Sequence, residues 1–208
     1  MMDFDFEQLP PSDRYRLLCS FVAPRPIALV TTLGESGTTN AAPMSFFNVF
    51  SQDPPILILG IQAKPDGTEK ETIRNIRRTG EFTVNMCDMK IAQQMVDCGI
   101  GFPDDFDEVL MTGLSHAPSI KVGPSRVAEA PAAMECCTQQ IIEYPRRAIV
   151  LGEVVQMHVD DTCLDDAGRY VRPENYQPIA RLHADNYIVC DRQFVLTASP
   201  ALKSANET

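Results

Sequence analysis

The sequence predicts an all-β fold with short peripheral helices, arranged as an antiparallel β-barrel or a sandwich. About six extended runs of apolar and β-branched residues are present, against three short segments with helical spacing. Two pairs of these runs are joined by turn residues, which is typical of antiparallel hairpins. No run is followed by a glycine-rich dinucleotide fingerprint, so a doubly wound α/β sheet is disfavoured. If the protein uses a nicotinamide cofactor, that cofactor binds without a glycine-rich fingerprint.

The first element along the chain is a predicted helix at residues 12–21. Ser12 is placed to cap the first backbone N–H groups of this helix. Tyr15, Leu18 and Phe21 follow at intervals of three residues and form part of a helical apolar face. The helix is expected to end before the next proline.

A β-hairpin and a further strand follow the helix. Residues 27–32 (IALVTT) form an apolar, β-branched run that ends at the turn residues 34–37. A second extended run follows at 38–42, and together the two predict a hairpin. The sequence DPP at 53–55 then starts a third strand, 56–61 (ILILGI). Because this strand is apolar on both faces, we expect it to be central or covered.

A second helix is predicted at about residues 70–79. Thr68 lies three positions before Glu71, as a capping box requires. Ile73 and Ile76 supply the apolar face, and Gly80 is the expected stop.

A strand at 81–86 and a short helix at 90–98 come next. Each has one apolar face, which we expect to turn inward. The inward residues are Phe82, Val84 and Met86 in the strand, and Ile91, Met95 and Cys98 in the helix.

The second half of the chain contains loops and a second hairpin. Prolines, acids and glycines interrupt the pattern at 101–131, which predicts long loops with short extended pieces. Residues 132–143 and 148–159 read as two strands joined by a turn at 144–147. Residues 168–189 are polar, aromatic and proline-containing, so we expect a structured loop that packs over another part of the protein.

The chain is expected to form one domain, 1–208, with an N-terminal helix at about 12–22 and a C-terminal tail at about 195–208. Its 44% hydrophobic residues suffice for an ordinary core. The net charge of −10 repels polyanions, so no nucleic acid partner is expected. There is no signal-peptide pattern and no run of the ~20 apolar residues that cross a bilayer. We therefore expect a cytoplasmic protein without a membrane partner.

Acidic residues cluster twice, each time near Pro, Gly or Thr. Neither cluster has the spacing of an EF-hand loop, so both are predicted to be solvated loops and not calcium sites. The clusters are Asp104, Asp105, Asp107 and Glu108, and Asp160, Asp161, Asp165 and Asp166.

The seven cysteines contain no CxxC pair, and no His cluster has metal-ligand spacing. We expect reduced thiols and no metal site. Cys136 and Cys137 are neighbours in a predicted strand, so one thiol is expected to be buried while the other faces the opposite side.

Residues 24–55 hold the densest group of small polar residues in the chain. Their hydroxyl and amide groups lie in or beside the first hairpin, where they can bind a phosphate or the edge of a heterocycle. The alternative is threonines that face solvent on a β-surface. Ser45 lacks the context of a nucleophile elbow, and no catalytic triad is predicted. The group is Thr31, Thr32, Thr38, Thr39, Asn40, Ser45 and Asn48.

The order of residues in this stretch resembles the flavin reductase-like family of FMN-binding split barrels. The chain has PRPIA at 24–28, VTT at 30–32, NAAP at 40–43, SFFN at 45–48 and DPP at 53–55. The match continues with KET at 70–72, NI at 75–76, GEF at 80–82, Asn85 and GEV at 152–154, and it covers residues 14 to about 190. The resemblance implies an antiparallel split β-barrel of Greek-key type.

It also implies an FMN site along the first hairpin and the loop that follows. A flavin ring needs N–H donors at its pyrimidine edge and at N5, where charge builds on reduction. Ser45 and backbone amides are implied to lie near the isoalloxazine, with Asn48 at its polar edge. The residues implied to line the site are Thr31, Thr32, Asn40, Ala42, Ser45, Phe46, Phe47 and Asn48.

Five further residues are implied near the flavin. Lys70 and Thr72 would hold the phosphate with a cation, a hydroxyl and the positive end of a helix dipole. The alternative for Lys70 is an exposed lysine at a helix start. Arg25 would reach the phosphate or ribityl region, or pair with an acid on the surface. Arg181 and Tyr187 are implied to lie close to the ring.

In one loop the chain departs from the family, which usually carries R-x-G-G-x-x-Y. His183 and Ala184 replace the paired glycines. Glycine adopts a positive φ where Ala and His resist it, so the loop conformation is not carried over. His183 either shields the ring or donates to a substrate, or it is a surface residue.

The implied activity is an FMN-dependent oxidoreductase. NADH or NADPH would reduce the flavin, which would pass electrons to free flavin, a partner oxygenase or a small acceptor. The alternatives are an electron carrier without NAD(P)H activity and a non-catalytic split barrel. Hydride transfer needs a stacked nicotinamide and the exclusion of water, so no catalytic side chain is predicted. The resemblance further implies a homodimer, with the flavin near the subunit interface and the pocket completed by residues 173–190.

Overall fold

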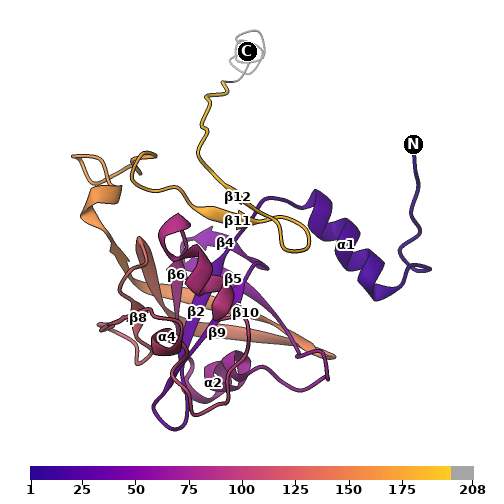
Figure 1. Ribbon diagram of the computed structural model, residues 1–208, viewed down its shortest axis with the longest axis horizontal. Coiled ribbons are helices and arrows are strands. Elements are labelled where there is room, and N and C mark those ends of the chain that lie inside the picture. Colours follow the sequence, from indigo (N-terminus) through magenta and orange to yellow (C-terminus); the bar gives the residue numbers. More distant parts are fainter. Residues whose placement is uncertain (198–208) are drawn as a thin grey trace.

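A seven-stranded antiparallel sheet forms the centre of the protein in the computed structural model, whose description covers residues 1–197 (Figure 1). The strand order is β3-β2-β6-β9-β10-β5-β4, and the predicted all-β class is confirmed. The strands are β2 (Ala28–Leu33), β3 (Thr39–Met44), β4 (Phe47–Gln52), β5 (Pro55–Gln62), β6 (Glu81–Met86), β9 (Ala132–Tyr144) and β10 (Arg147–Val159).

The two edge strands, β3 and β4, are separated in the chain by Ser45 and Phe46 alone. The three peptide steps from Met44 to Phe47 span at most about 11 Å. The edges of the sheet must therefore approach each other here, so the sheet curls into a barrel. The backbone N–H of Gly60 in β5 donates to the Phe46 carbonyl oxygen at 2.7 Å, which ties the junction to the barrel wall.

Both predicted hairpins are confirmed. β2 pairs with β3 in the register Ala28↔Met44, and β9 pairs with β10 across the turn in the register Tyr144↔Arg147. β5 lies between β10 and β4, as expected for a strand that is apolar on both faces. β4 was not predicted, because its alternate residues Asn48, Phe50 and Gln52 are exposed and it reads as a loop.

Two smaller sheets complete the β-structure. β1 (Arg25–Pro26), β11 (Ile179–Arg181) and β12 (Tyr187–Val189) form one, and β7 (His116–Ala117) pairs with β8 (Arg126–Val127) in the other. The segment 168–189, which we expected to be a packed loop, thus contains the β11–β12 hairpin. In this hairpin β11 also pairs with β1, which directly precedes β2 in the chain. Of the C-terminal tail predicted at about 195–208, residues 198–208 lie outside the described residues.

Helix α1 (Pro11–Phe21) confirms the first predicted helix, but its capping differs. Pro10 is the N-cap and Pro11 opens the helix, where its missing N–H costs nothing. Ser12 does not cap. The apolar face of Leu18 and Phe21 is 51% and 84% exposed, so it does not pack against the sheet.

Helix α2 (Glu71–Thr79) begins at its N-cap Lys70, so the predicted capping box is wrong. The Thr68 hydroxyl donates to Asp66 Oδ1 at 2.6 Å in the preceding turn instead. The rest of the prediction is confirmed. Ile73 and Ile76 are buried, and Gly80 ends the helix at φ 71° with its N–H on the Ile76 carbonyl.

The remaining helices are short: α3 (Ala92–Asp97), α4 (Glu108–Met111) and the 3₁₀ turns η1 (Met89–Ile91) and η2 (Asp161–Cys163). Among residues 1–197 no helix combines the length and apolar character needed to cross a membrane. The predicted inward faces are confirmed, since Phe82, Val84, Ile91, Met95 and Cys98 are buried and Met86 packs against the main core. All seven cysteines are free, with Cys136 buried and Cys137 half-buried.

The first acidic cluster is not uniformly a solvated loop. Asp104 and Asp105 are exposed as predicted, but Glu108 is only 6% exposed. Strand β3 is an edge, and its outward N–H groups need acceptors. The Thr39 N–H donates to Asp107 Oδ2 at 3.1 Å and the Ala41 N–H donates to Glu108 Oε2 at 2.6 Å. These two acids therefore cap the sheet edge, which corrects the prediction for them.

Candidate functional site

Three cavities meet at Ser45, the residue at which the barrel closes. The largest is a groove of about 640 Å³, and the other two measure about 280 Å³ and 150 Å³. Ser45 lines all three. Because β3 ends at Met44 and β4 begins at Phe47, the barrel wall itself holds this residue at the meeting point.

The Ser45 junction offers hydrogen-bonding groups that the protein does not use. Within residues 1–197, the Ser45 hydroxyl and the backbone N–H groups of Ser45 and Phe46 have no protein hydrogen-bond partner. Both residues lie outside the strands, so no ladder bond occupies these groups. The junction can therefore present donors to the polar edge of a bound heterocycle.

The 280 Å³ cavity extends from Ser45 toward β11 and β12. Met44, Met95 and Tyr187 contribute apolar surface, and Arg181 also lines it. The Arg181 guanidinium carbon lies 4.7 Å from the centroid of the Tyr187 ring, and Arg181 Nη1 also donates to the Tyr187 hydroxyl. The resemblance implied that Arg181 and Tyr187 both lie close to the flavin ring. The β11–β12 hairpin places both residues in the same cavity as Ser45.

The 150 Å³ cavity extends from Ser45 in the other direction, to Lys70 at the start of α2. Lys70 is half-buried, and burial lowers its pKa, an effect that the negative charge of Glu108 opposes. Its ammonium makes no ion pair or hydrogen bond with the described residues, whereas Arg77 on the same helix pairs with Glu143 at 2.9 Å. Lys70 is thus a cation available to an anionic group.

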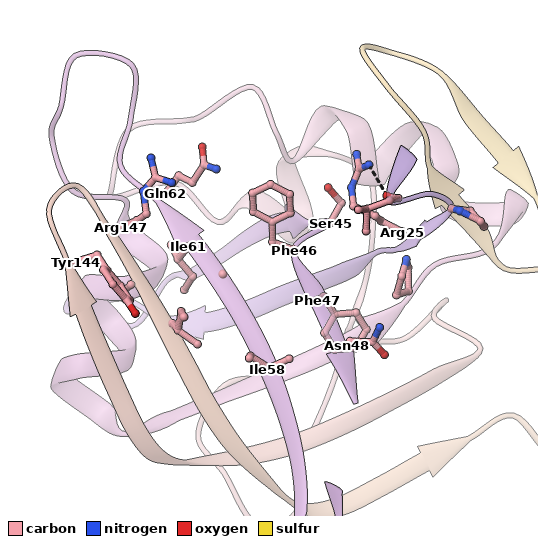
Figure 2. A pocket seen from close by; sticks show the side chains of 16 residues that line it. Arg25, Ser45, Phe46, Phe47, Asn48, Ile58, Ile61, Gln62, Tyr144 and Arg147 are labelled. Carbon is pink, nitrogen blue, oxygen red and sulfur yellow. Dashed lines mark hydrogen bonds between the residues drawn. The ribbon is translucent and has the colours of Figure 1, made fainter. Parts of the chain in front are cut away.

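The 640 Å³ groove lies on the outer face of β5 and β10 (Figure 2). Figure 2 shows Arg25 and Asn48 at one end and Tyr144 and Arg147 at the other, with Phe46 between them on one side. Gly60 forms part of the floor, and a Cβ there would lie 2.9 Å from Phe46 Cβ. Only glycine at this position lets the junction pack against β5.

Four of the predicted residues are buried and line none of the three cavities at Ser45. Asn40 Nδ2 donates to Thr32 Oγ1 at 3.2 Å and to Thr72 Oγ1 at 3.1 Å, and Asn75 Nδ2 donates to Thr32 Oγ1 at 3.1 Å. Thr31 Oγ1 donates to the Ser125 carbonyl oxygen at 2.6 Å. All are at most 6% exposed. These bonds join β2, β3 and α2 through Thr32, Asn40 and Thr72, whereas Thr31 joins β2 to the loop before β8.

Arg25 does not pair with a surface acid, and its contact with the phosphate or ribityl region stays a prediction. Arg25 is 6% exposed and donates to the carbonyl oxygens of Cys19 (2.7 Å), Val22 (3.2 Å) and Leu182 (2.7 Å). Pairing with a surface acid is therefore wrong. The guanidinium ties the end of α1 to the loop between β11 and β12, beside one end of the groove.

Three other predicted residues surround the junction. Ala42 is half-buried and packs against the main core, and Phe47 is 8% exposed and belongs to it. Asn48 is exposed at the groove, and its Oδ1 accepts the Val49 N–H at 2.8 Å. His183 is exposed, which matches the surface alternative.

Sequence reasoning missed Gln62, Tyr144 and Arg147 as cavity residues. The turn at 144–147 was predicted, and it places Tyr144 opposite Arg147. Only the pairing of β10 with β5 brings Gln62 beside them, and no local pattern reports that pairing.

Comparison with known proteins agrees with this architecture. The profile of the flavin reductase like domain family matches residues 21–179. An uncharacterised protein of Aquifex aeolicus (strain VF5) is 34% identical over 187 residues, covering 90% of this chain and 95% of the relative.

Two solved structures are similar over nearly their whole length. The 2-nitrobenzoate 2-nitroreductase NbaA of Pseudomonas fluorescens is 34% identical, with a TM-score of 0.86 and coverage of 96% of this chain and 97% of the other. Nitrilotriacetate monooxygenase component B of Bacillus cereus is 30% identical, with a TM-score of 0.89 and coverage of 94% and 98%. The chain belongs to the flavin reductase-like family.

Proposed function

We propose that the protein is an FMN-dependent oxidoreductase in which NADH or NADPH reduces bound flavin. The observation that carries this proposal is the Ser45 junction, which has donors without a protein partner and whose Ser45 lines three cavities. FMN, when bound, supplies reversible hydride and electron transfer. The chain has to bind it, orient it and keep water away.

The cavities suggest how the chain's residues divide this work. We propose that the isoalloxazine lies against Met44, Ser45 and Tyr187, with Arg181 at its rim. The phosphate would lie in the 150 Å³ cavity, where Lys70 provides an unpaired cation beside the first turn of α2.

The other predicted residues surround these proposed flavin contacts. Phe46, Phe47 and Asn48 shape the groove side of the junction, and Ala42 packs beneath it. We propose that Thr31, Thr32, Asn40, Thr72 and Arg25 hold the strands and the loop in position and do not touch the flavin.

The acceptor is proposed as free flavin, a partner oxygenase or a small molecule such as a nitroaromatic. Relatives named as a nitroreductase and as a monooxygenase component support these classes. An electron carrier without NAD(P)H activity remains the rival function, and the flavin absorbance separates the two.

The test is an anaerobic titration of purified protein with FMN and then with NADH and NADPH. We expect a flavin spectrum that bleaches on adding the nucleotide, and Lys70→Met to weaken FMN binding about tenfold or more because a charged phosphate contact is lost. The matched control is Lys90→Met, an exposed lysine outside the cavities. Absence of flavin affinity would overturn the proposal, and binding without bleaching would favour the carrier.

We also propose a homodimer. Strand β4 is a free edge whose Val49 and Phe50 are each 66% exposed. Leu18 and Phe21 on α1 add further exposed apolar surface, and α1 lies beside the sheet and not on it (Figure 1). A second copy would cover these side chains close to the Ser45 junction.

A further inference from the structure

We propose that Tyr144, Arg147 and Gln62 form a subsite for the adenosine 2′-phosphate end of NADPH, so that the protein prefers NADPH to NADH. This inference rests on the proposed function, in which a nicotinamide nucleotide reaches the Ser45 junction. It concerns the far end of the 640 Å³ groove, where the flavin proposal leaves Tyr144 and Arg147 unassigned, while Gln62 also borders the 150 Å³ cavity proposed for the FMN phosphate.

The three residues form one row across three neighbouring strands. Tyr144 of β9 pairs with Arg147 of β10, and Arg147 pairs with Gln62 of β5. Residues directly opposite each other in an antiparallel sheet lie on the same face with Cβ atoms about 4.5–5.5 Å apart. Ala148 is the next residue along β10 and is buried at 4% exposure, so Arg147 faces outward, into the groove.

The row combines an aromatic plane, a cation and an amide, none of which has a partner in the protein. Within residues 1–197, no hydrogen bond or ion pair is made by the side chains of Tyr144, Arg147 or Gln62. The neighbouring Arg146 differs, since it donates to the Pro65 carbonyl oxygen at 3.4 Å. An unpaired guanidinium at a cavity of a chain with net charge −10 is a selective contact for an anion.

The floor of the groove connects this row to the Ser45 junction. It is apolar, with Ile58, Gly60 and Ile149 among its residues. The Gly60 N–H binds the Phe46 carbonyl at the junction, and the two steps from Gly60 to Gln62 along β5 span roughly 7 Å at about 3.3 Å per residue. Tyr144 lies two strands further across the sheet, roughly 10 Å at about 4.8 Å per strand. A dinucleotide with its nicotinamide at Ser45 would therefore place its adenosine half toward Tyr144 and Arg147.

The position of Arg147 favours the 2′-phosphate over the pyrophosphate. Arg147 lies in one row with the exposed ring of Tyr144, on which an adenine can stack, and so at the adenosine end of the groove. On that half of the nucleotide, the additional dianionic group of NADPH is the 2′-phosphate, which the planar guanidinium binds with two parallel hydrogen bonds. NADH lacks this group.

A second copy of the chain is a less suitable occupant of this end. An apolar partner surface would have to bury the Arg147 guanidinium without a counter-ion, which is costly. The apolar edge strand β4 is the better surface for a second copy.

The experiment measures the binding of 2′,5′-ADP and 5′-AMP to the full-length protein by calorimetry. We expect 2′,5′-ADP to bind at least about tenfold more tightly than 5′-AMP, and Arg147→Ala to abolish the difference. Arg147→Lys should retain part of the difference, because the positive charge remains while the two parallel hydrogen bonds of the guanidinium are lost. Arg146→Ala is the matched control and should behave as the parent. Equal affinities in the parent, or an unchanged preference in Arg147→Ala, would overturn the proposal.

Two further measurements separate this inference from its alternatives. In steady-state assays Arg147→Ala should raise KM for NADPH about tenfold and leave kcat and KM for NADH unchanged. If Arg147→Ala changes the sedimentation of the protein and not its 2′,5′-ADP affinity, the row belongs to an interface and the inference fails. Because binding of 2′,5′-ADP needs neither flavin nor turnover, a protein that binds it through Arg147 but has no FMN affinity would refute the proposed function alone.

Discussion

Ala184 adopts a backbone conformation that its side chain disfavours. Its φ is 48°, in the left-handed region, at one of the two positions where the family usually has glycine. The Leu182 N–H donates to the Asn186 carbonyl oxygen at 2.9 Å across this turn, and Arg25 binds the Leu182 carbonyl. The surrounding hydrogen bonds thus retain the loop without the glycine.

Replacing this residue with glycine should stabilise the protein. A non-glycine residue in the left-handed region costs about 1–2 kcal/mol, while glycine adds about 0.4–1 kcal/mol of unfolded-state entropy. For Ala184→Gly we expect a net gain of roughly 0.5–1 kcal/mol in the free energy of unfolding, measured by urea denaturation. Ala92→Gly is the control and should lose stability, because Ala92 has helical dihedrals (φ −60°, ψ −43°) that glycine does not favour. A loss of stability in Ala184→Gly would show that the turn is not strained.

Glu108 makes stability depend on pH. Burial raises the pKa of its carboxyl from 4.5 to about 7, although the backbone N–H groups of Ala41 and Phe102 donate to it and oppose the shift. A raised carboxyl pKa means that the folded state binds more protons than the unfolded state between these values. The contribution of Glu108 to stability is therefore present below about pH 4.5 and is lost as pH rises to about 7.

Glu108→Gln should remove this dependence while keeping an oxygen acceptor for the Ala41 N–H. Relative to the parent, the variant should gain stability from pH 5 to pH 7.5, by up to about 3 kcal/mol. Chemical denaturation across this range measures the difference. The control is Glu7→Gln, an exposed residue near the N-terminus. A difference that stays constant with pH would contradict the assignment.

At the scale of elements, one side chain holds a whole loop against the sheet. Glu135 of β9 is 0% exposed and accepts the N–H groups of Ile120 at 2.8 Å and Lys121 at 2.6 Å, and a contact from His158 Nε2 at 2.6 Å. Burial alone would raise the pKa of Glu135, but these donors outweigh it and the pKa lies below its ordinary value. Glu135 thus anchors residues 118–125, whose Ser125 carbonyl in turn accepts the Thr31 hydroxyl.

Glu135→Gln should loosen this loop selectively. The amide has one acceptor oxygen where the carboxylate has two, so a buried N–H is left unpaired at a cost of roughly 1–3 kcal/mol. We expect hydrogen exchange at the amides of Ile120 and Lys121 to accelerate about tenfold or more, while amides of β2 are little changed. Glu153→Gln on β10 is the control, since Glu153 accepts from Gln139 at the surface and not from this loop. Unchanged exchange at 120 and 121 would refute the anchor.

At the scale of the molecule, an edge strand and the first helix each carry exposed apolar side chains. Val49 and Phe50 of β4 and Leu18 and Phe21 of α1 are 51–84% exposed. An unpaired edge strand with an apolar surface tends to associate. This feature supports the proposed homodimer with the Ser45 junction near its interface.

Phe50→Asp should therefore shift the protein toward the monomer, because a charge would be buried without a partner in the interface. Sedimentation velocity measures the shift. Ile120→Asp is the control, since Ile120 is 70% exposed and lies on the loop anchored by Glu135, away from β4. A parent protein that is already monomeric, or a dimer insensitive to Phe50→Asp, would contradict the proposed interface.

The sequence by itself determined the elements whose signals are local. Alternation and turn residues specify both hairpins, and Gly80 specifies the end of α2, because these depend on neighbouring residues alone. The order of residues from 24 to 48 also identified the family and pointed to Ser45. β4 and the β11–β12 hairpin were not predicted. The alternate residues of β4 are exposed, and β11 and β12 have only three residues each, so neither gives a periodic apolar pattern.

Only the tertiary structure decided what each polar side chain of the site contacts. Thr32 and Asn40 belong to the same small polar group of the sequence as Ser45. The packing of α2 on β2 and β3 buries these two residues, while barrel closure leaves Ser45 at three cavities. Arg147 and Gln62 are 85 positions apart and become neighbours only through the β5–β10 pairing. The physical reason is that burial and pairing partners depend on contacts distant in the chain, to which local sequence patterns do not respond.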